Sequence, residues 1–239
     1  MSNLDVKYLD IFMGQYTKEG KNGRTHAYDL FHNEFKNALR IKKPTPEIYD
    51  SLACHLYAFL GNWGMLRGSG FLLQLNYKSL IPTIKIVSEP KYRWLLDIDI
   101  TKLSSKEEEK YCKDIFDLKG RISSTFNEIP CYKFDLEKKE YVRKKINVSD
   151  TFVGEVLMGT LGCYISCDEY TRECLRDHSV PRSFDKRQIA EIVKLIKSNI
   201  VILTHYTDLK KSIKTDCDYS VMKLLDSVLW QEGCMKNKK

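Results

Sequence analysis

The chain has 239 residues, of which 43% are apolar and 30% are charged, and its formal charge at neutral pH is +7. This composition excludes an intrinsically disordered protein, because enough apolar side chains are present to form a full core. No apolar stretch approaches the roughly 20 residues that cross a bilayer, and the N-terminus lacks a basic segment followed by an apolar one. We therefore expect a soluble, cytoplasmic protein with no membrane partner.

The first half of the chain carries strong helix signals. Residues 45–47 (Thr-Pro-Glu) combine an N-cap residue, a proline at the first helical position and an early acid, and apolar residues follow at helical spacing to about Leu60. Residues 105–108 (Ser-Lys-Glu-Glu) fit the capping-box pattern ahead of a second apolar face. Residues 61–70 contain four glycines, too many for a helix interior. We expect a turn there, in which Arg67 meets an anion or the glycines let two helices approach.

The second half combines a strand signal with further helices. Residues 131–146 alternate loosely between apolar and polar side chains, which predicts a small β-hairpin. Apolar stripes at helical spacing follow over residues 152–157, 189–196 and 221–229. The sequence therefore predicts a mainly α protein. It is either one compact multi-helix domain or two closely packed helical lobes over residues 1–130 and 131–239.

Basic side chains gather in two clusters, residues 138–145 and residues 182–197. Such clusters attract phosphate backbones, so a nucleic acid such as DNA is a possible partner. The competing interpretation is that the lysines only keep the surface solvated. The charge pattern leaves both interpretations open.

The eight cysteines are scattered, and several stand inside apolar helical patterns, where cysteine acts as a small hydrophobic residue. We expect them to be reduced thiols. Cys163, Cys167, Cys174 and His178 offer zinc-binding side chains at helical spacings, but the knuckle spacing of a structural zinc site is absent. The sequence therefore predicts packed cysteines, with no metal and no cofactor.

The most informative stretch is residues 147–173, where an apolar helical run, the break Gly159-Thr160-Leu161-Gly162 and a second helical run follow one another. A glycine turn between two helices offers backbone N–H groups to a phosphate. This stretch resembles the helix-hairpin-helix element of base-excision DNA glycosylases. In that family the hairpin binds a DNA phosphate, and a downstream aspartate stabilises the cationic sugar that forms as the base leaves.

The resemblance implies a catalytic role for Asp168 or Asp185, which would support cleavage of the glycosidic bond of a flipped base. The chain departs from the family pattern, because no proline precedes the first glycine and Asp168 lies closer to the hairpin than the family's aspartate does. Asp185 is better spaced, but it looks equally like a helix cap. No lysine occupies the position used by lyase-competent members, which implies a monofunctional enzyme. The residues expected to bind nucleic acid are Gly159, Gly162, Arg67, Arg172 and Arg176.

Residues 63–69 and 159–163 also look like segments of a group of uncharacterised bacterial proteins that carry them in the same order. That resemblance implies a common fold and no activity. The rival hypothesis is a non-catalytic helical interaction protein from a bacterial accessory or defence locus, with a protein partner. A glycosylase needs a deep cleft with a carboxylate facing a basic rim, whereas an interaction module needs a flat or grooved apolar patch. The sequence leaves the oligomeric state open.

Overall fold

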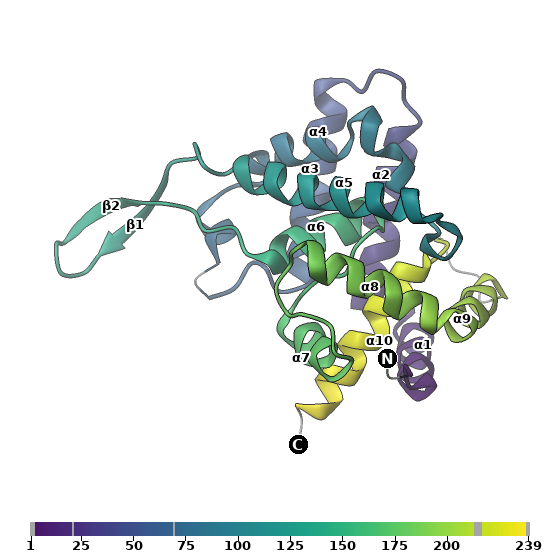
Figure 1. Ribbon diagram of the computed structural model, residues 1–239. Coiled ribbons are helices and arrows are strands. Elements are labelled where there is room, and N and C mark those ends of the chain that lie inside the picture. Colours follow the sequence, from purple (N-terminus) through teal and green to yellow (C-terminus); the bar gives the residue numbers. More distant parts are fainter. Residues whose placement is uncertain (1–2, 21, 69, 213–216, 238–239) are drawn as a thin grey trace.

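The computed structural model describes residues 3–20, 22–68, 70–212 and 217–237, without the side chains of residues 133 and 207–212. Within these residues the chain forms ten α-helices and one two-stranded antiparallel sheet (Figure 1). The predicted mainly α fold is therefore confirmed. The α-helices are α1 (Val6–Glu19), α2 (Ala27–Leu39), α3 (Pro46–Asn62), α4 (Ile81–Val87), α5 (Ser105–Ser124), α6 (Asp150–Leu161), α7 (Glu169–Asp177), α8 (Lys186–Ser198), α9 (Ile200–Ser212) and α10 (Val221–Lys236). Short 3-10 helices are η1 (Arg24–His26), η2 (Phe71–Gln74), η3 (Tyr77–Leu80), η4 (Pro90–Leu95) and η5 (Ile100–Lys102).

Local sequence signals set the helix starts. Thr45 is the N-cap residue of α3, as predicted, and the helix runs two residues beyond the expected end at Leu60. The capping box of α5 is formed by Ser104 and Glu107, so the predicted cap at Ser105 was wrong by one residue. The Ser104 N–H and hydroxyl donate to Glu107 Oε2 at 2.9 and 2.7 Å. Ser104 is therefore the N-cap residue, and Glu107 is the third residue of the helix.

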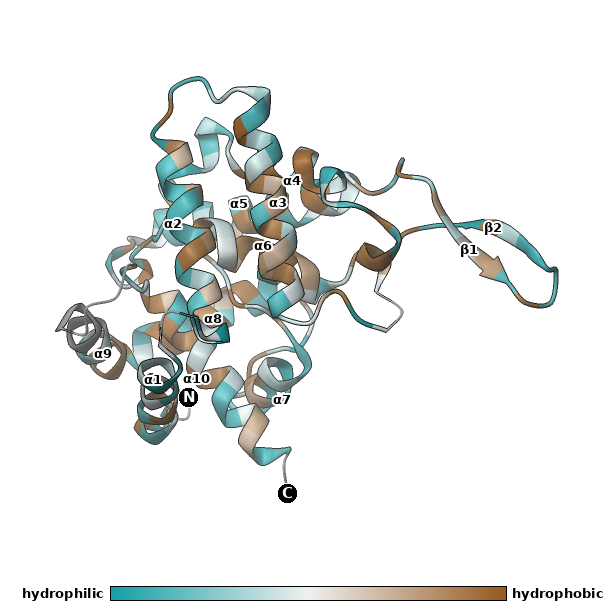
Figure 2. Cartoon of the chain, turned by 180° about the vertical axis from the view of Figure 1, so that it is seen from behind, coloured by the Kyte–Doolittle hydropathy of each residue, from teal (hydrophilic) through white to brown (hydrophobic). Residues whose placement is uncertain are grey.

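Helix α6 forms the centre of the molecule. All of its residues from Phe152 to Leu161 are buried, and it packs against α2, α3, α4 and α5. Figure 2 shows the apolar segments of α3 and α6 side by side in the body of the protein. A helix that is buried all round has no solvent face on which a charged residue is ordinarily placed. The single acid in this buried run, Glu155, therefore requires a physical explanation.

The predicted hairpin is present and projects from the helical body (Figure 1). Strands β1 (Cys131–Asp135) and β2 (Glu140–Lys144) pair antiparallel, with Tyr132 opposite Arg143 and Phe134 opposite Tyr141. Side chains alternate between the faces of a strand, so these four residues share one face of the hairpin.

The two predicted segments, residues 1–130 and 131–239, share one hydrophobic core. Helix α1 packs against α10, α2 against α6, and α5 against α8, so three helix interfaces join the two segments. No helix in the described part of the chain is long and apolar enough to span a membrane.

Candidate functional site

A largely enclosed pocket lies where α1, α3, α6 and α10 meet. Its walls are aromatic, and polar side chains from α6 and α10 face into it. The cavity has a volume of about 40 Å³, which is room for a few water molecules. The aromatic residues of the lining are Phe12, Phe59, Trp63 and Trp230, and the charged ones are Arg24, Glu155, Lys223 and Asp226.

Glu155 is a buried acid that lines this pocket. Its side chain extends from the middle of α6, and the residue is only 5% exposed. No hydrogen bond joins its carboxyl group to any residue that the structure describes. Burial raises the pKa of Glu155 well above its usual range, and the nearby charges of Asp226 and Asp168 act in the same direction. These surroundings favour the protonated form of Glu155 more than water does.

Lys223 and Asp226 form an ion pair on the wall of the pocket that α10 supplies. They lie one turn apart on α10, and Lys223 Nζ is 3.2 Å from Asp226 Oδ2 although both residues are about 5% exposed. The Ser166 N–H donates to Asp226 Oδ1 at 2.8 Å. Lys223 Nζ also lies over the Tyr28 and Trp63 rings, at 5.0 and 5.5 Å from their centroids. Asp226 thus has partners for its ionised form, in contrast to Glu155.

Trp63 and Arg24 contact each other in the lining of the pocket. Trp63 caps the C-terminus of α3, and the Arg24 guanidinium carbon lies 4.9 Å from the centroid of its ring. The Trp63 indole N–H is buried and has no hydrogen-bond partner among the described residues. An unpaired buried donor in a pocket lining is a group that a bound ligand can satisfy.

Glycines and helix caps bring these side chains together. Glycine at position 159 leaves room for the Phe59 ring, since a Cβ there would lie 2.6 Å from Phe59 Cε1. Three residues further on, Gly162 adopts a left-handed conformation with φ of 60° and ends the helix. The Ser220 hydroxyl caps α10 and donates to the Gly162 carbonyl at 3.0 Å. This bond fixes the start of α10, and with it Lys223, relative to α6.

The glycine turn predicted to bind phosphate lies inside the protein. Residues 159–163 are buried, and the Gly162 N–H donates to the Met158 carbonyl at 3.1 Å. The Leu161 carbonyl accepts from the Asp97 N–H at 2.8 Å. In this conformation Gly159 and Gly162 serve helix packing and termination, and their N–H groups do not face solvent.

The two predicted catalytic aspartates are both helix caps. Asp168 caps α7 by accepting from the Thr171 N–H at 2.7 Å, and Asp185 caps α8 by accepting from the Gln188 N–H at 2.8 Å. Asp168 lies near the pocket: burial raises its pKa, and its carboxyl group interacts with the Trp230 side chain, which lines the pocket. Asp185 is outside the pocket lining. Of the two, only Asp168 is close to the charged groups of the pocket.

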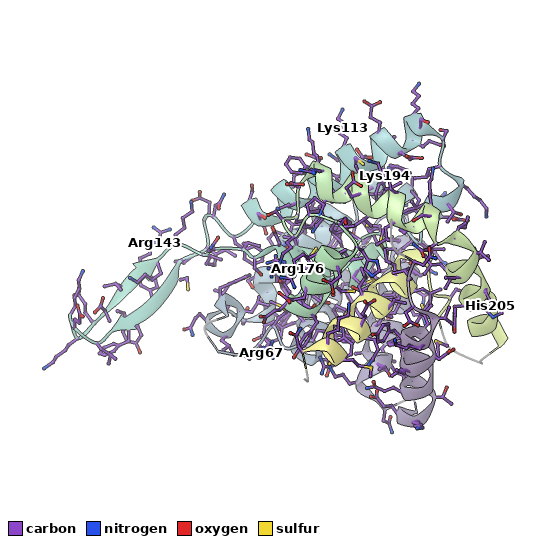
Figure 3. All side chains as sticks on the ribbon, turned by 60° about the horizontal axis from the view of Figure 1, so that its bottom comes forward. Arg67, Lys113, Arg143, Arg176, Lys194 and His205 are labelled. Atoms are coloured by element: carbon purple, nitrogen blue, oxygen red, sulfur yellow. The ribbon has the colours of Figure 1, made fainter. Side chains whose placement is uncertain are left out.

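Of the three predicted DNA-binding arginines, Arg172 and Arg176 lie one turn apart on α7, and Arg67 lies in the first half of the chain; Figure 3 labels Arg67 and Arg176. Arg67 is exposed in the glycine-rich loop after α3. Arg172 NH2 is 3.6 Å from Asp150, and Arg176 NH2 is 3.4 Å from Glu173. Two of the three thus have acidic partners within the protein, which reduces the positive charge that they offer to a ligand.

Sequence reasoning missed the groups that line the pocket. Their signal was present as charged residues inside apolar helical runs: Glu155 in residues 151–161, and Lys223 and Asp226 in residues 221–230. Charges at core positions are rare unless they are paired or functional. None of the protein-family models, curated proteins or solved structures compared with the chain matches it.

Proposed function

We propose that the protein binds nucleic acid and accepts a flipped nucleobase in the pocket between α6 and α10, where the N-glycosidic bond is cleaved. The observation that carries the proposal is the combination of a buried carboxyl group whose pKa is raised, an aspartate paired with a lysine, and aromatic walls around one enclosed space. Base-excision enzymes read a flipped base by stacking it between apolar side chains and by hydrogen bonds to its edge.

The two acids are suited to different parts of this reaction. Glu155 carries a proton and can donate a hydrogen bond to the departing base, which gains negative charge as the glycosidic bond breaks. Lys223 and the Ser166 N–H each contact one oxygen of Asp226, and a carboxylate in this position stabilises the positive charge that develops on the sugar. Lys223 orients Asp226 in this scheme.

Entry of a base requires the mouth of the pocket to open. The present cavity holds only a few water molecules, so Arg24 and Trp63 must turn aside before a base can enter. Arg24 is exposed and belongs to the short helix η1, so its movement disturbs little of the core. Opening at the moment of binding is a common step in enzymes that exclude water from the reaction.

A surface next to the pocket supports nucleic acid as the partner. Met65, Gly68 and Gly70 follow Trp63 in the chain and line a groove that is also lined by Lys144 and Lys145, at the base of the hairpin. Beyond the groove, one hairpin face carries Tyr132, Phe134, Tyr141 and Arg143, all of them exposed. Basic grooves that track a phosphate backbone, together with exposed aromatic side chains that stack on bases, are the common elements of single-strand binding surfaces.

The test is binding of the full chain to a duplex with a stable abasic-site analogue, compared with an undamaged duplex and a single strand over a salt series. We expect preference for the abasic analogue, and loss of that preference in Trp63→Ala. The control is Asp185→Asn, which alters a helix cap outside the pocket and should leave the preference intact. Equal binding to all three nucleic acids would contradict the proposed base-excision activity. No binding at low salt would contradict the proposed binding of nucleic acid.

Activity is tested with duplexes that carry deaminated or alkylated bases, with base release read as strand cleavage in alkali. For a base that the wild type releases, we expect Glu155→Gln and Asp226→Asn to slow release at least about 100-fold, since general acids and charge-stabilising groups each contribute that much. Full activity in both variants would contradict the assigned roles.

A second function, protein recognition, is favoured by the same hairpin. Leu136 is 83% exposed and Tyr141 is 71% exposed, which is unusual for an element with so little support from the core. If the hairpin binds a protein partner instead, removing its aromatic side chains will leave nucleic-acid affinity unchanged. The salt series with Tyr132→Ala and Tyr141→Ala separates the two functions.

A further inference from the structure

A second polar cluster lies away from the pocket, between the last turn of α7 and the C-terminal part of α10. It consists of Cys174, His178 and Glu232, which are 0%, 4% and 6% exposed. Their potential ligand atoms all lie within 4.8 Å of one another, and His178 Nε2 is 3.4 Å from Glu232 Oε2. Two of the three residues were noted in the sequence at helical spacing, but Glu232 comes from a different helix and could not be associated with them.

From this cluster we propose that Cys174, His178 and Glu232 bind one Zn²⁺ ion. Thiolate, imidazole and carboxylate are the three ligand types that zinc takes from proteins. Bond lengths of about 2.0–2.3 Å place tetrahedral ligand atoms about 3.3–3.6 Å apart, so closing the cluster onto an ion needs shifts of about 1 Å. On binding, the Cys174 thiol releases its proton to solvent and the sulfur coordinates the metal as a thiolate.

The surroundings of Glu232 fit the role of a metal ligand. Lys236 Nζ lies 2.7 Å from Glu232 Oε1 and 2.7 Å from Asp177 Oδ2, which leaves Oε2 on the side of His178. A ligating carboxylate in proteins is normally oriented by such an outer partner on its other oxygen. Three protein ligands leave the fourth tetrahedral position to water.

The helices that supply the ligands are held firmly together. Gly233 follows Glu232, and any side chain at that position would collide with the backbone carbonyl of Tyr170 at the start of α7. The backbones of α7 and α10 therefore touch, and the three side chains converge without a movement of either helix. A zinc ion here joins the C-terminal helix, which carries Lys223 and Asp226, to α7.

The test uses the full chain, reduced, freed of metal with a chelator and titrated with Zn²⁺ against a chromophoric zinc indicator. We expect one equivalent to bind with a submicromolar Kd. Cys174→Ser and Glu232→Gln should each weaken binding at least tenfold, and Cys54→Ser, which alters an exposed cysteine, should bind as the wild type does. No saturable binding, or equal binding by all variants, would overturn the proposal.

A spectroscopic measurement on the wild type covers the case in which Cys174→Ser fails to fold. Co²⁺ replaces Zn²⁺ in tetrahedral sites, and a thiolate ligand gives it an intense charge-transfer absorption. We expect that band to saturate at one equivalent of Co²⁺ and to be abolished by one equivalent of Zn²⁺. Binding of Co²⁺ without the band would show that Cys174 is not a ligand. The result is independent of nucleic-acid binding, so it stands or falls separately from the proposed function.

Discussion

Two carboxyl groups on facing walls of one pocket have different surroundings. Asp226 accepts from Lys223 and from a backbone N–H. Burial and two neighbouring acids raise the pKa of Glu155 and so disfavour its charged form. Such a pair is costly for the folded state, since a buried carboxyl group without a hydrogen-bond partner destabilises it. Proteins retain these groups mainly at functional sites, where the loss of stability is offset by chemistry.

Replacing Glu155 by glutamine should stabilise the protein while removing the proposed activity. The pKa of Glu155 is raised in the folded protein, so between about pH 4.3 and that raised pKa the folded state holds a proton that the unfolded state has lost. The free energy of unfolding of the wild type therefore falls as the pH rises through this interval. We expect Glu155→Gln to be more stable than the wild type by about 0.5–2 kcal/mol at pH 7.5, and the difference to shrink towards pH 4.

Chemical unfolding at several pH values measures this difference. Glu109→Gln, an exposed acid on α5, is the matched control and should track the wild type throughout. A Glu155→Gln protein that is less stable than the wild type at pH 7.5 would mean that the carboxylate is ionised and paired in the folded state.

Adding a single methyl group at Gly162 should destabilise the fold. Its φ of 60° disfavours any residue with a Cβ, and an added Cβ would lie 2.9 Å from Asp97 Oδ1 and 3.1 Å from the Tyr28 hydroxyl. We expect Gly162→Ala to lower the free energy of unfolding by about 1–3 kcal/mol, as measured by urea unfolding. Gly14→Ala, at a helical position with open space around it, should instead be neutral or raise stability by up to about 1 kcal/mol. Equal effects of the two variants would show that neither conformation nor crowding at Gly162 matters.

At the scale of elements, the hairpin contacts the helical body at its base, where β1 meets η2 and Cys131 is buried. A two-stranded hairpin is marginal in water, and the cross-strand pair Phe134 and Tyr141, with ring centroids 5.3 Å apart, is the main contact that holds its outer part. A binding role explains the solvent-exposed aromatic side chains of the hairpin more readily than a structural role does.

Charge at the base of the hairpin should control the salt dependence of nucleic-acid binding. Each lysine that neutralises a phosphate contributes about 1 to the slope of log Kd against log salt concentration. We expect the double variant Lys144→Ala, Lys145→Ala to lose about 2 from that slope, measured by fluorescence anisotropy with a labelled single strand. Lys113→Ala, on the outer face of α5 and far from the hairpin in Figure 3, should leave the slope unchanged. A loss in Lys113→Ala of similar size would indicate a diffuse electrostatic effect and no defined groove.

The sequence predicted the helices and the hairpin well but did not predict the pocket, because only the former depend on local signals. The cap of α3, the cap of α8 at Asp185 and the hairpin depend on residues within a few positions of each other, and such local signals can be recognised in the sequence alone. The pocket depends on α6 meeting α10, which local patterns do not encode. Gly159 and Gly162 were read as a surface turn because their spacing is compatible with one, but their burial is decided by Phe59, Asp97 and Ser220.

At the scale of the whole molecule, hydrogen bonds and an ion pair join the two predicted lobes. The Tyr111 hydroxyl donates to the Cys163 carbonyl at 2.6 Å, the Leu4 N–H donates to Asn199 Oδ1 at 2.9 Å, and Lys119 pairs with Asp150 at 2.6 Å. Helix α1, at the N-terminus, covers α10, which supplies half of the charged groups in the pocket. The pocket therefore exists only when both segments are folded together.

This shared core should make unfolding a single event. We expect one thermal transition by differential scanning calorimetry, with a calorimetric enthalpy equal to the van't Hoff enthalpy. Residues 1–130 and 131–239, produced separately, should lack stable tertiary structure, because each would expose the apolar face that the other covers. Near-ultraviolet circular dichroism of each half measures this directly, with the intact chain as the reference. Two resolved transitions, or a half that folds alone, would instead establish two lobes, and the pocket would then lie at an interface whose opening admits the ligand.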